Sequence, residues 1–232
     1  MRVIRSYWKD WPEGHDVFSE IPEVPMFNDV IYVYGEEAKA DIPELEKRGY
    51  DVRHIEEEVF NKDGLVYGRK IISLILGLQD WGEVLMLDWD CVPVKPIDEK
   101  FMLYMMEKPT QVPLYAHPTQ NPYGNSYKFN GVFLQPNFGF VYSRDKYFGN
   151  ELLNLAIQYN IVGMTDEWAM QTFAKPYTPF GYIEMYHPKV CFGVDKDFFL
   201  KDPESESSKL QLPLIKKVEE QLGGMDIYFK HK

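Results

Sequence analysis

Short apolar runs alternate with helix-like patterns along most of the chain. The runs are rich in β-branched and aromatic residues, which predicts strands at 2–7, 30–34, 50–55, 84–87, 112–116, 132–134, 138–142 and 182–186. Apolar residues at helical spacing predict helices at 38–48, 68–78, 98–107, 147–160, 167–174 and 210–222. The opening order of strand, loop, strand, helix, strand is typical of an α/β protein.

The run at 84–87, VLML, is the most informative of these segments. Four apolar residues between Gly82 and an acidic Asp88-Trp89-Asp90 triplet predict a strand buried on both faces, at the centre of a largely parallel sheet. Ligands of open α/β sheets bind outside the carboxyl ends of the strands, where the two aspartates are expected. Alternation along an extended chain would send both carboxylates to the same side, which suits one hard cation. The alternative is a strand that simply ends in solvated acids.

Two basic residues, Arg69 and Lys70, open the predicted helix that leads into this strand. Positive charge is unfavourable at a helix N-terminus, so another interaction must favour these side chains there. A bound diphosphate would do so, and the alternative is two exposed side chains without a role.

Further candidates for a binding or catalytic role lie in the second half of the chain. The segment 117–131 is rich in turn-forming and aromatic residues and indicates a binding loop or a flap. Gly139 would permit close approach of a ligand to the backbone or, alternatively, would only serve packing. Asp166 and Glu167 follow Thr165 at a predicted helix start, where capping alone would account for both acids.

Composition narrows the class of protein. The chain has 232 residues, 45% of them hydrophobic, and suits one domain at 1–200 with an appended charged linker and helix at 201–232 that pack on it. A net charge of -11 argues against a protein that coats nucleic acid, although a bound divalent cation would still allow an anionic ligand. Two cysteines, Cys91 and Cys191, exclude a disulfide framework, and no stretch suits a signal peptide or a membrane span. We expect a cytoplasmic protein.

The order of these motifs resembles a known family. A basic helix, the run VLMLDWD, a strand containing NFGF and a helix start DEW together are similar to nucleotide-sugar-dependent glycosyltransferases of the GT-A fold, over about the middle half of the chain. The resemblance implies a single Rossmann-like domain with a mostly parallel central sheet flanked by helices and a small antiparallel portion on the acceptor side. It also implies that Asp88 and Asp90 hold Mn²⁺ or Mg²⁺, which binds the diphosphate of the donor.

The resemblance gives provisional roles to other residues. Many members add a histidine from near the C-terminus as a metal ligand, and His187 is the first candidate here, with His231 second. Asn137 and Gly139 resemble the strand that lines the sugar site. Asp166 or Glu167 resembles the acid near the donor sugar and would be the base of an inverting enzyme.

Arg69 and Lys70 would contact the nucleotide or its phosphates, and Tyr7, Trp8 and Trp89 complete the expected donor-binding set. The base would stack on Trp8, Trp11 or Tyr34.

The resulting hypothesis is a metal-dependent glycosyltransferase with a nucleoside-diphosphate sugar, preferably a UDP-sugar, as donor. Its hydroxyl acceptor would be a saccharide, a protein side chain or a hydroxymethylated DNA base of the kind that compact phage transferases modify; nucleic acid enters only as acceptor. The residue pattern leaves open a retaining or an inverting course. It also leaves open a non-catalytic carbohydrate- or protein-binding module. A sugar nucleotidyltransferase is disfavoured, because SYWKDWPEGHD lacks a glycine-rich basic loop after the first strand.

Overall fold

A computed structural model describes most of the first 158 residues and parts of the remainder. The described residues are 1–9, 16–27, 29–56, 68–106, 109–112, 114–117, 127–129, 132–136, 138–158, 190–192, 200, 202–206, 208–210, 212–213, 216, 220 and 226–231.

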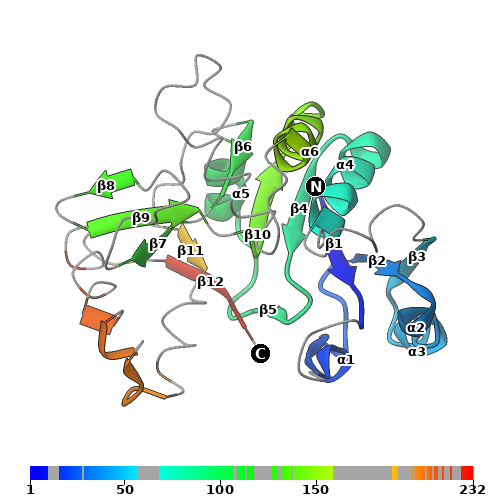
Figure 1. Cartoon of the computed structure of the whole chain (residues 1–232), viewed down its shortest axis with the longest axis horizontal. Helices are drawn as coiled ribbons and strands as arrows, with labels where there is room; N and C mark the ends of the chain where they lie inside the picture. Colours follow the sequence, from blue (N-terminus) through cyan, green and yellow to red (C-terminus); the bar gives the residue numbers. More distant parts are fainter. Residues whose placement is uncertain are drawn as a thin grey trace.

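Helices and strands alternate along the first half of the chain, and short strands predominate after it (Figure 1). In order they are β1 (Arg2–Tyr7), α1 (Val17–Glu20), β2 (Val30–Tyr34), α2 (Glu36–Lys39), α3 (Ile42–Lys47), β3 (Asp51–Ile55), α4 (Gly68–Trp81), β4 (Val84–Leu87), β5 (Cys91–Pro93), α5 (Glu99–Met106), β6 (Thr110–Gln111), β7 (Leu114–His117), β8 (Tyr127–Phe129), β9 (Val132–Pro136), β10 (Phe140–Ser143), α6 (Phe148–Gln158), β11 (Val190–Phe192) and β12 (Asp226–His231).

A six-stranded sheet in the order β3-β2-β1-β4-β10-β6 forms the centre of the molecule. Strands β3, β2, β1 and β4 are parallel, whereas β10 runs antiparallel to both β4 and β6. The predicted α/β fold with a mostly parallel central sheet is therefore confirmed. All four residues of β4 are buried, as the apolar run predicts.

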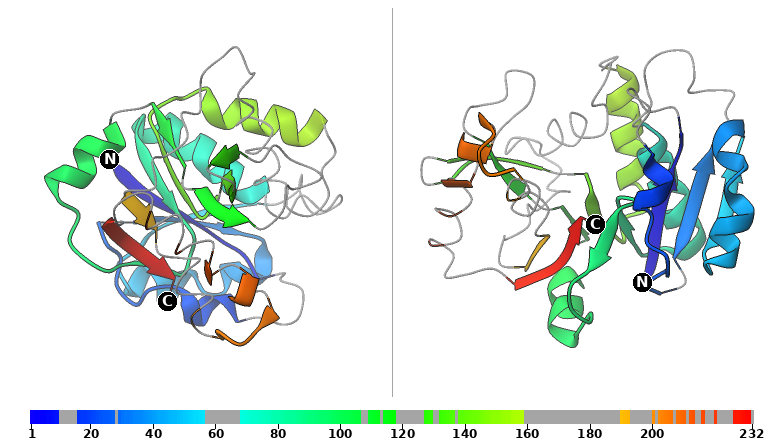
Figure 2. Two further views of the ribbon diagram at one scale, coloured as in Figure 1. Left: turned by 90° about the vertical axis from the view of Figure 1, so that its left-hand side faces the viewer. Right: turned by 90° about the horizontal axis from the view of Figure 1, so that it is seen from below.

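Side chains alternate between the two faces of this sheet and build a core on each. Ile4, Tyr32 and Met86 face α4 and α6 in one cluster. Val3 and Leu85 face α5 and β12, and Ile31 packs with residues of α1, α2 and α3 on that same second face. The views along two further directions show the sheet between these layers (Figure 2).

Two smaller sheets lie beside the central one. Strands β7, β9 and β8 form an antiparallel sheet, which is the small antiparallel portion expected from the resemblance. In the other, β12 pairs parallel with β11 and antiparallel with β5. Through β12, the C-terminal part of the chain joins the strand that follows the Asp88-Trp89-Asp90 triplet.

Several predicted elements differ from those observed. The helix predicted at 38–48 is two helices, α2 and α3, because Pro43 is suited to a first helical turn and not to a helix interior. The strand predicted at 112–116 is replaced by β6 and β7, which belong to different sheets. Pro93 ends β5, which lies at the edge of its sheet, where proline is tolerated.

Other predictions concern positions that the structure describes only in part. The predicted helix 167–174 and the strand 182–186 lie outside the described residues. Between 206 and 220 the described positions that are helical are 206, 208–210, 212–213, 216 and 220. None of the helices in the described ranges is both long and apolar enough to cross a bilayer.

Candidate functional site

The acidic triplet forms a tight turn at the carboxyl end of β4. Trp89 and Asp90 are turn residues, and the Cys91 N–H donates to the carbonyl of Asp88 at 3.2 Å. Asp88 and Asp90 were predicted to share one side because the chain was expected to be extended there. That premise is wrong, because the strand ends at Leu87 and the backbone turns. The Asp88 N–H donates to the carbonyl of Gly139 at 2.9 Å, so the residue before β10 anchors the start of the turn.

Lys70 forms an ion pair with the first acid of this turn. Its Nζ lies 2.5 Å from Oδ1 of Asp88, and the side chains are only 9% and 17% exposed. The same Nζ lies 5.7 Å from the centre of the Trp89 ring, within the range of a cation–π contact. The interpretation of Lys70 as an exposed side chain without a role is wrong, and Asp88 is not a merely solvated acid.

Arg69, the residue before Lys70, is buried beside Trp8. It is 1% exposed, and its guanidinium carbon lies 5.5 Å from the centre of the Trp8 ring. Trp8 in turn meets Trp89 edge-on, with ring centres 5.3 Å apart. The Tyr34 hydroxyl donates to the carbonyl of Arg69 at 2.9 Å and fixes the first turn of α4 against β2. The alternative of an exposed Arg69 is wrong as well.

Three of the aromatic residues proposed for donor binding are buried, whereas Trp11 lies outside the described residues. Tyr7 and Trp8 are fully buried and Tyr34 is 1% exposed. Burial and the hydrogen bond to Asp41 raise the pKa of Tyr7 well above its ordinary value. A base cannot stack on these rings unless the residues that cover them move, so their direct contact with a nucleotide stays a prediction.

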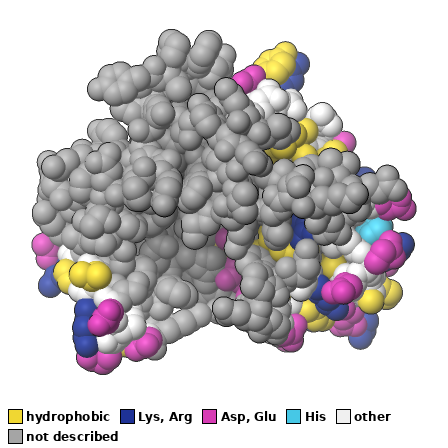
Figure 3. All heavy atoms as spheres, viewed as in Figure 1, with side chains coloured by type: hydrophobic (Ala, Val, Ile, Leu, Met, Phe, Trp, Pro, Cys, Tyr) yellow, Lys and Arg dark blue, Asp and Glu magenta, His cyan; other side chains and the backbone are white. Residues whose placement is uncertain are grey.

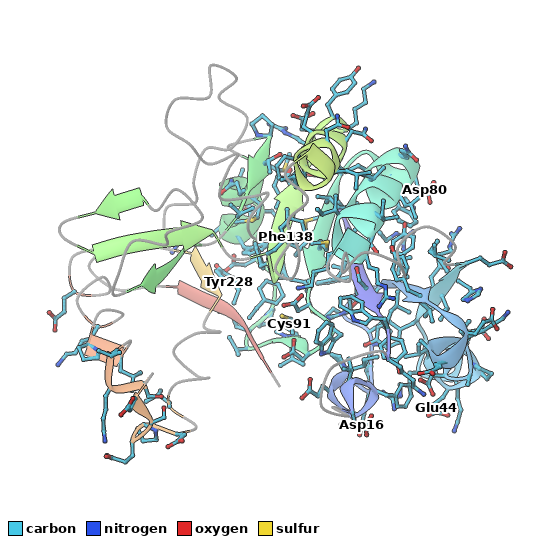
Figure 4. All side chains as sticks on the ribbon, in the orientation of Figure 1. Asp16, Glu44, Asp80, Cys91, Phe138 and Tyr228 are labelled. Carbon is cyan, nitrogen blue, oxygen red and sulfur yellow. The ribbon has the colours of Figure 1, made fainter. Side chains whose placement is uncertain are left out.

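Cys91 closes the turn as a packed thiol. It is buried with Tyr228 in the cluster that covers the second face of the sheet, and both are labelled near the centre of Figure 4. Burial, together with the charges of Asp90 and Asp88, raises the pKa of the Cys91 thiol well above its usual value. The thiol therefore stays protonated at neutral pH and is a poor nucleophile and metal ligand.

The register of β12 brings one candidate histidine near the acidic turn. His231 pairs with Cys91, so its backbone lies opposite the residue that follows Asp90. His187, Asn137, Asp166 and Glu167 lie outside the described residues. Within the described ranges, no group of three or more His, Cys, Asp or Glu side chains is placed to hold a metal ion.

The acidic turn nevertheless suits a divalent cation. Carboxylate oxygens of Asp88 and Asp90 are the hard ligands that Mn²⁺ and Mg²⁺ prefer, and Asp88 already holds the cationic Nζ of Lys70. Acidic side chains show at the centre of the space-filling view, while acids and bases are mixed over α2, α3 and β3 at its right (Figure 3).

Two charged residues that contact the turn were missed from the sequence. Glu20, at the end of α1, accepts a hydrogen bond from the Trp89 indole N–H at 3.1 Å. Arg5, in the middle of β1, donates to the carbonyl of Asp88 at 2.7 Å. A charged residue in the interior of the predicted strand RVIRSY was the one available signal for Arg5, whereas nothing in the sequence distinguishes Glu20 from the other acids of the chain.

Known structures match this architecture over the whole chain. An active-site mutant of LgtC matches with a TM-score of 0.56 and 12% identity, and covers 100% of this chain and 86% of its own. The galactosyltransferase LgtC in complex with donor and acceptor sugar analogs matches with a TM-score of 0.54 and 11% identity, with coverage of 100% and 86%. Mouse xyloside xylosyltransferase 1, in its apo form, matches with a TM-score of 0.53 and 12% identity, with coverage of 100% and 96%.

These matches establish the fold and not the activity. The chain has the GT-A fold of these glycosyltransferases, as the resemblance implied. No protein-family model matches the sequence, and no curated protein matches it either.

Proposed function

We propose that the protein is a metal-dependent glycosyltransferase that uses a nucleoside-diphosphate sugar, with UDP-sugars favoured, and a hydroxyl acceptor. The observation that carries the proposal is the buried ion pair of Asp88 with Lys70 in a tight acidic turn at the carboxyl end of β4. In an α/β sheet this is the expected position of a ligand crevice, and the GT-A fold supports sugar transfer there.

Asp88 and Asp90 would supply carboxylate oxygens to Mn²⁺ or Mg²⁺. The pairing of His231 with Cys91 favours His231 as a further ligand, with His187 the alternative. When bound, such a cation neutralises charge that develops on the departing nucleoside diphosphate. Lys70 would exchange its contact with Asp88 for an oxygen of the same diphosphate, because the cation would then neutralise Asp88 in its place.

The remaining assignments come from the resemblance. Asn137 and Gly139 would line the sugar site, and Asp166 or Glu167 would accept the acceptor proton in an inverting reaction. A saccharide or protein acceptor is favoured over a hydroxymethylated DNA base, because a net charge of -11 opposes approach to a phosphate backbone. Action in the cytoplasm is part of the same proposal.

A donor panel tests the proposal. UDP-, GDP- and CDP-sugars would be assayed for hydrolysis and for thermal stabilisation of the protein, with and without Mn²⁺. We expect turnover of a UDP-sugar only with metal, and a loss of about 100-fold or more in Asp90→Asn and in Asp88→Asn, because each removes a charged ligand. Asp80→Asn, at an exposed carboxylate near the end of α4, is the matched control.

Two outcomes would contradict the proposal. If no donor is turned over and no donor stabilises the protein, a nucleotide-sugar enzyme is excluded. Binding of a carbohydrate or protein that survives EDTA and both aspartate substitutions would favour the non-catalytic binding module instead.

A further inference from the structure

A buried ion pair lies directly behind the acidic turn, on the second face of the central sheet. Arg5 of β1 and Asp29, just before β2, are both fully buried. The Arg5 Nε donates to Oδ2 of Asp29 at 2.9 Å. The other carboxylate oxygen of Asp29 accepts the Phe27 N–H at 2.9 Å, so the acid is itself held in place.

One of the two remaining nitrogens of Arg5 points to the turn. Nη1 donates to the carbonyl of Asp88 at 2.7 Å and lies 3.3 Å from the carbonyl of Trp89. Nη2 approaches the sulfur of Met26 at 3.7 Å. One guanidinium therefore binds two successive peptide groups of the turn, in addition to its carboxylate partner.

From this geometry we propose that Arg5 is a positioning residue for the metal- and donor-binding turn, and that Asp29 is its counter-charge. The inference rests on the proposed function. Carbonyl directions at Asp88 and Trp89 fix the planes of the two peptides on either side of Trp89. Those planes set where the side chains of Asp88 and Asp90 project, so Arg5 acts on the acids through their backbone.

Asp29 supplies the negative charge that balances Arg5. A lone buried cation behind the turn would oppose a divalent cation in front of it, and its own burial would be costly. Asp29 neutralises Arg5, so the turn receives strong hydrogen-bond donors without a net positive charge. A lysine cannot replace this arrangement, because an ammonium group lacks the planar fork that reaches a carboxylate and two carbonyls together.

The competing explanation is a core ion pair that only stabilises the fold. The two explanations predict different metal affinities for a variant that is still folded. A structural role predicts lower stability with unchanged affinity for metal, whereas a positioning role predicts weaker metal binding in the folded state.

The test compares Arg5→Lys, Arg5→Met and Asp29→Asn with the unaltered chain. Binding of Mn²⁺ in the presence of UDP would be followed by electron paramagnetic resonance of the free ion, below the unfolding temperature of each variant as judged by circular dichroism. The matched control is Thr110→Val, which removes a buried hydrogen bond of 2.8 Å to the Ser143 hydroxyl, between β6 and β10 and away from the Arg5–Asp29 pair.

We expect Arg5→Lys and Arg5→Met to raise the Kd for Mn²⁺ by about 10-fold or more, as loss of a residue that orients metal ligands does elsewhere. Asp29→Asn should also raise the Kd for Mn²⁺, whereas Thr110→Val should leave that Kd within about twofold even though stability falls. In the transfer assay the KM for the donor should rise in the Arg5 variants.

A Kd within about twofold of the unaltered value in folded Arg5→Lys or Arg5→Met would overturn the positioning role, as would an equal loss of affinity in Thr110→Val. If Arg5→Met does not fold, Arg5→Lys decides, since it retains a cation for Asp29. Absence of Mn²⁺ binding by the unaltered chain is a different result, which refutes the proposed function and the positioning role with it.

Discussion

The ammonium group of Lys70 occupies a place where a metal ion would compete with it. Asp88 is its partner at 2.5 Å, and both side chains are largely buried. A buried carboxylate needs a compensating charge, so the turn can remain folded before any ligand binds. A metal ion that binds Asp88 as proposed would have to displace Lys70 from it.

Substitution of Lys70 by methionine separates these two effects. We expect Lys70→Met to bind Mn²⁺ alone more tightly, by roughly three- to tenfold, because a competing cation is removed. We expect the KM for the nucleotide-sugar donor to rise by about 10-fold, because a phosphate contact is lost. Metal titrations without nucleotide and steady-state kinetics would measure the two quantities.

Lys47→Met is the control for that experiment, since the Lys47 side chain is 78% exposed and pairs with Glu44 across one helical turn. Weaker Mn²⁺ binding by Lys70→Met would contradict competition and would indicate that Lys70 mainly supports the shape of the turn.

At the residue scale, the sequence predicted that Arg69, Lys70 and Asp88 lie at one edge of the sheet but not which side chains contact each other. Asp88, Lys70 and Arg69 lie close enough in sequence for helix and strand patterns to bring them to one sheet edge. The contacts of Arg5 with Asp88 and of Glu20 with Trp89 join residues 83 and 69 positions apart, and no local pattern encodes them. The turn itself was missed because Cys91 begins a strand whose partner, β12, is far along the chain.

Among the elements, α4 is the one that connects the site to the core. Its first turn carries Arg69 and Lys70, and its middle packs closely on the sheet at Gly77, where an added Cβ would lie 2.8 Å from Cδ1 of Ile4. Helix α6 packs on its outer side through Gly149. The position of Lys70 relative to Asp88 thus depends on close contacts made along the whole helix.

Replacement of Gly149 by alanine tests this packing. The new Cβ would lie 2.6 Å from Cγ1 of Ile75 and 3.4 Å from the backbone of the same residue, so α6 or Ile75 must shift. Overpacking of this kind costs about 1–3 kcal/mol, which outweighs the gain of up to about 1 kcal/mol from alanine in a helix. Urea denaturation would measure the loss of stability.

A double-mutant cycle supplies the control for Gly149→Ala. In an Ile75→Ala background the clash is removed, so Gly149→Ala should become neutral or stabilising. A stabilising effect of Gly149→Ala in the unaltered chain would contradict the close contact between α6 and α4.

The elements that apolar patterns predicted are those with buried faces of their own. Strands β1, β2 and β4 and helices α4, α5 and α6 were predicted near their observed bounds, because each carries an apolar run or stripe. Strand β3 was also predicted, although none of its residues is fully buried. Strands β5 and β11 have three residues each, too few for a clear local signal. Strand β12 was missed although its run Ile227-Tyr228-Phe229 favours a strand. The domain division at 200 and the site residues outside the described ranges stay predictions.

Over the whole molecule, the central sheet is lined on both faces by buried tyrosines. Tyr7, Tyr32 and Tyr142 lie in its strands, and Tyr50 immediately precedes β3. Burial is the largest cause that raises the pKa of each of these four phenols. For Tyr50 the pKa rises to about 12. The same apolar layers that position the acidic turn thus make folding sensitive to alkaline pH.

The last prediction follows from the sign of these shifts. An unfolded tyrosine loses its proton near pH 10, whereas folded Tyr50 retains it to about pH 12. Between these values the unfolded state binds fewer protons, so the free energy of unfolding falls by about 1.4 kcal/mol per pH unit for each such tyrosine. For Tyr50 alone the loss reaches about 3 kcal/mol across this window, and it is absent below pH 10.

Parallel titrations would measure this dependence through tyrosinate absorbance and far-ultraviolet circular dichroism. We expect the buried tyrosines to ionise together with the loss of helix signal, since their neutral form is the one that the folded state retains. Tyr50→Phe should remove the contribution of one tyrosine to the slope of the free energy of unfolding against pH. Tyr147→Phe, at a side chain 63% exposed, should leave that slope unchanged. Ionisation of all the tyrosines while the circular dichroism stays native would contradict the burial of these phenols on the two faces of the sheet.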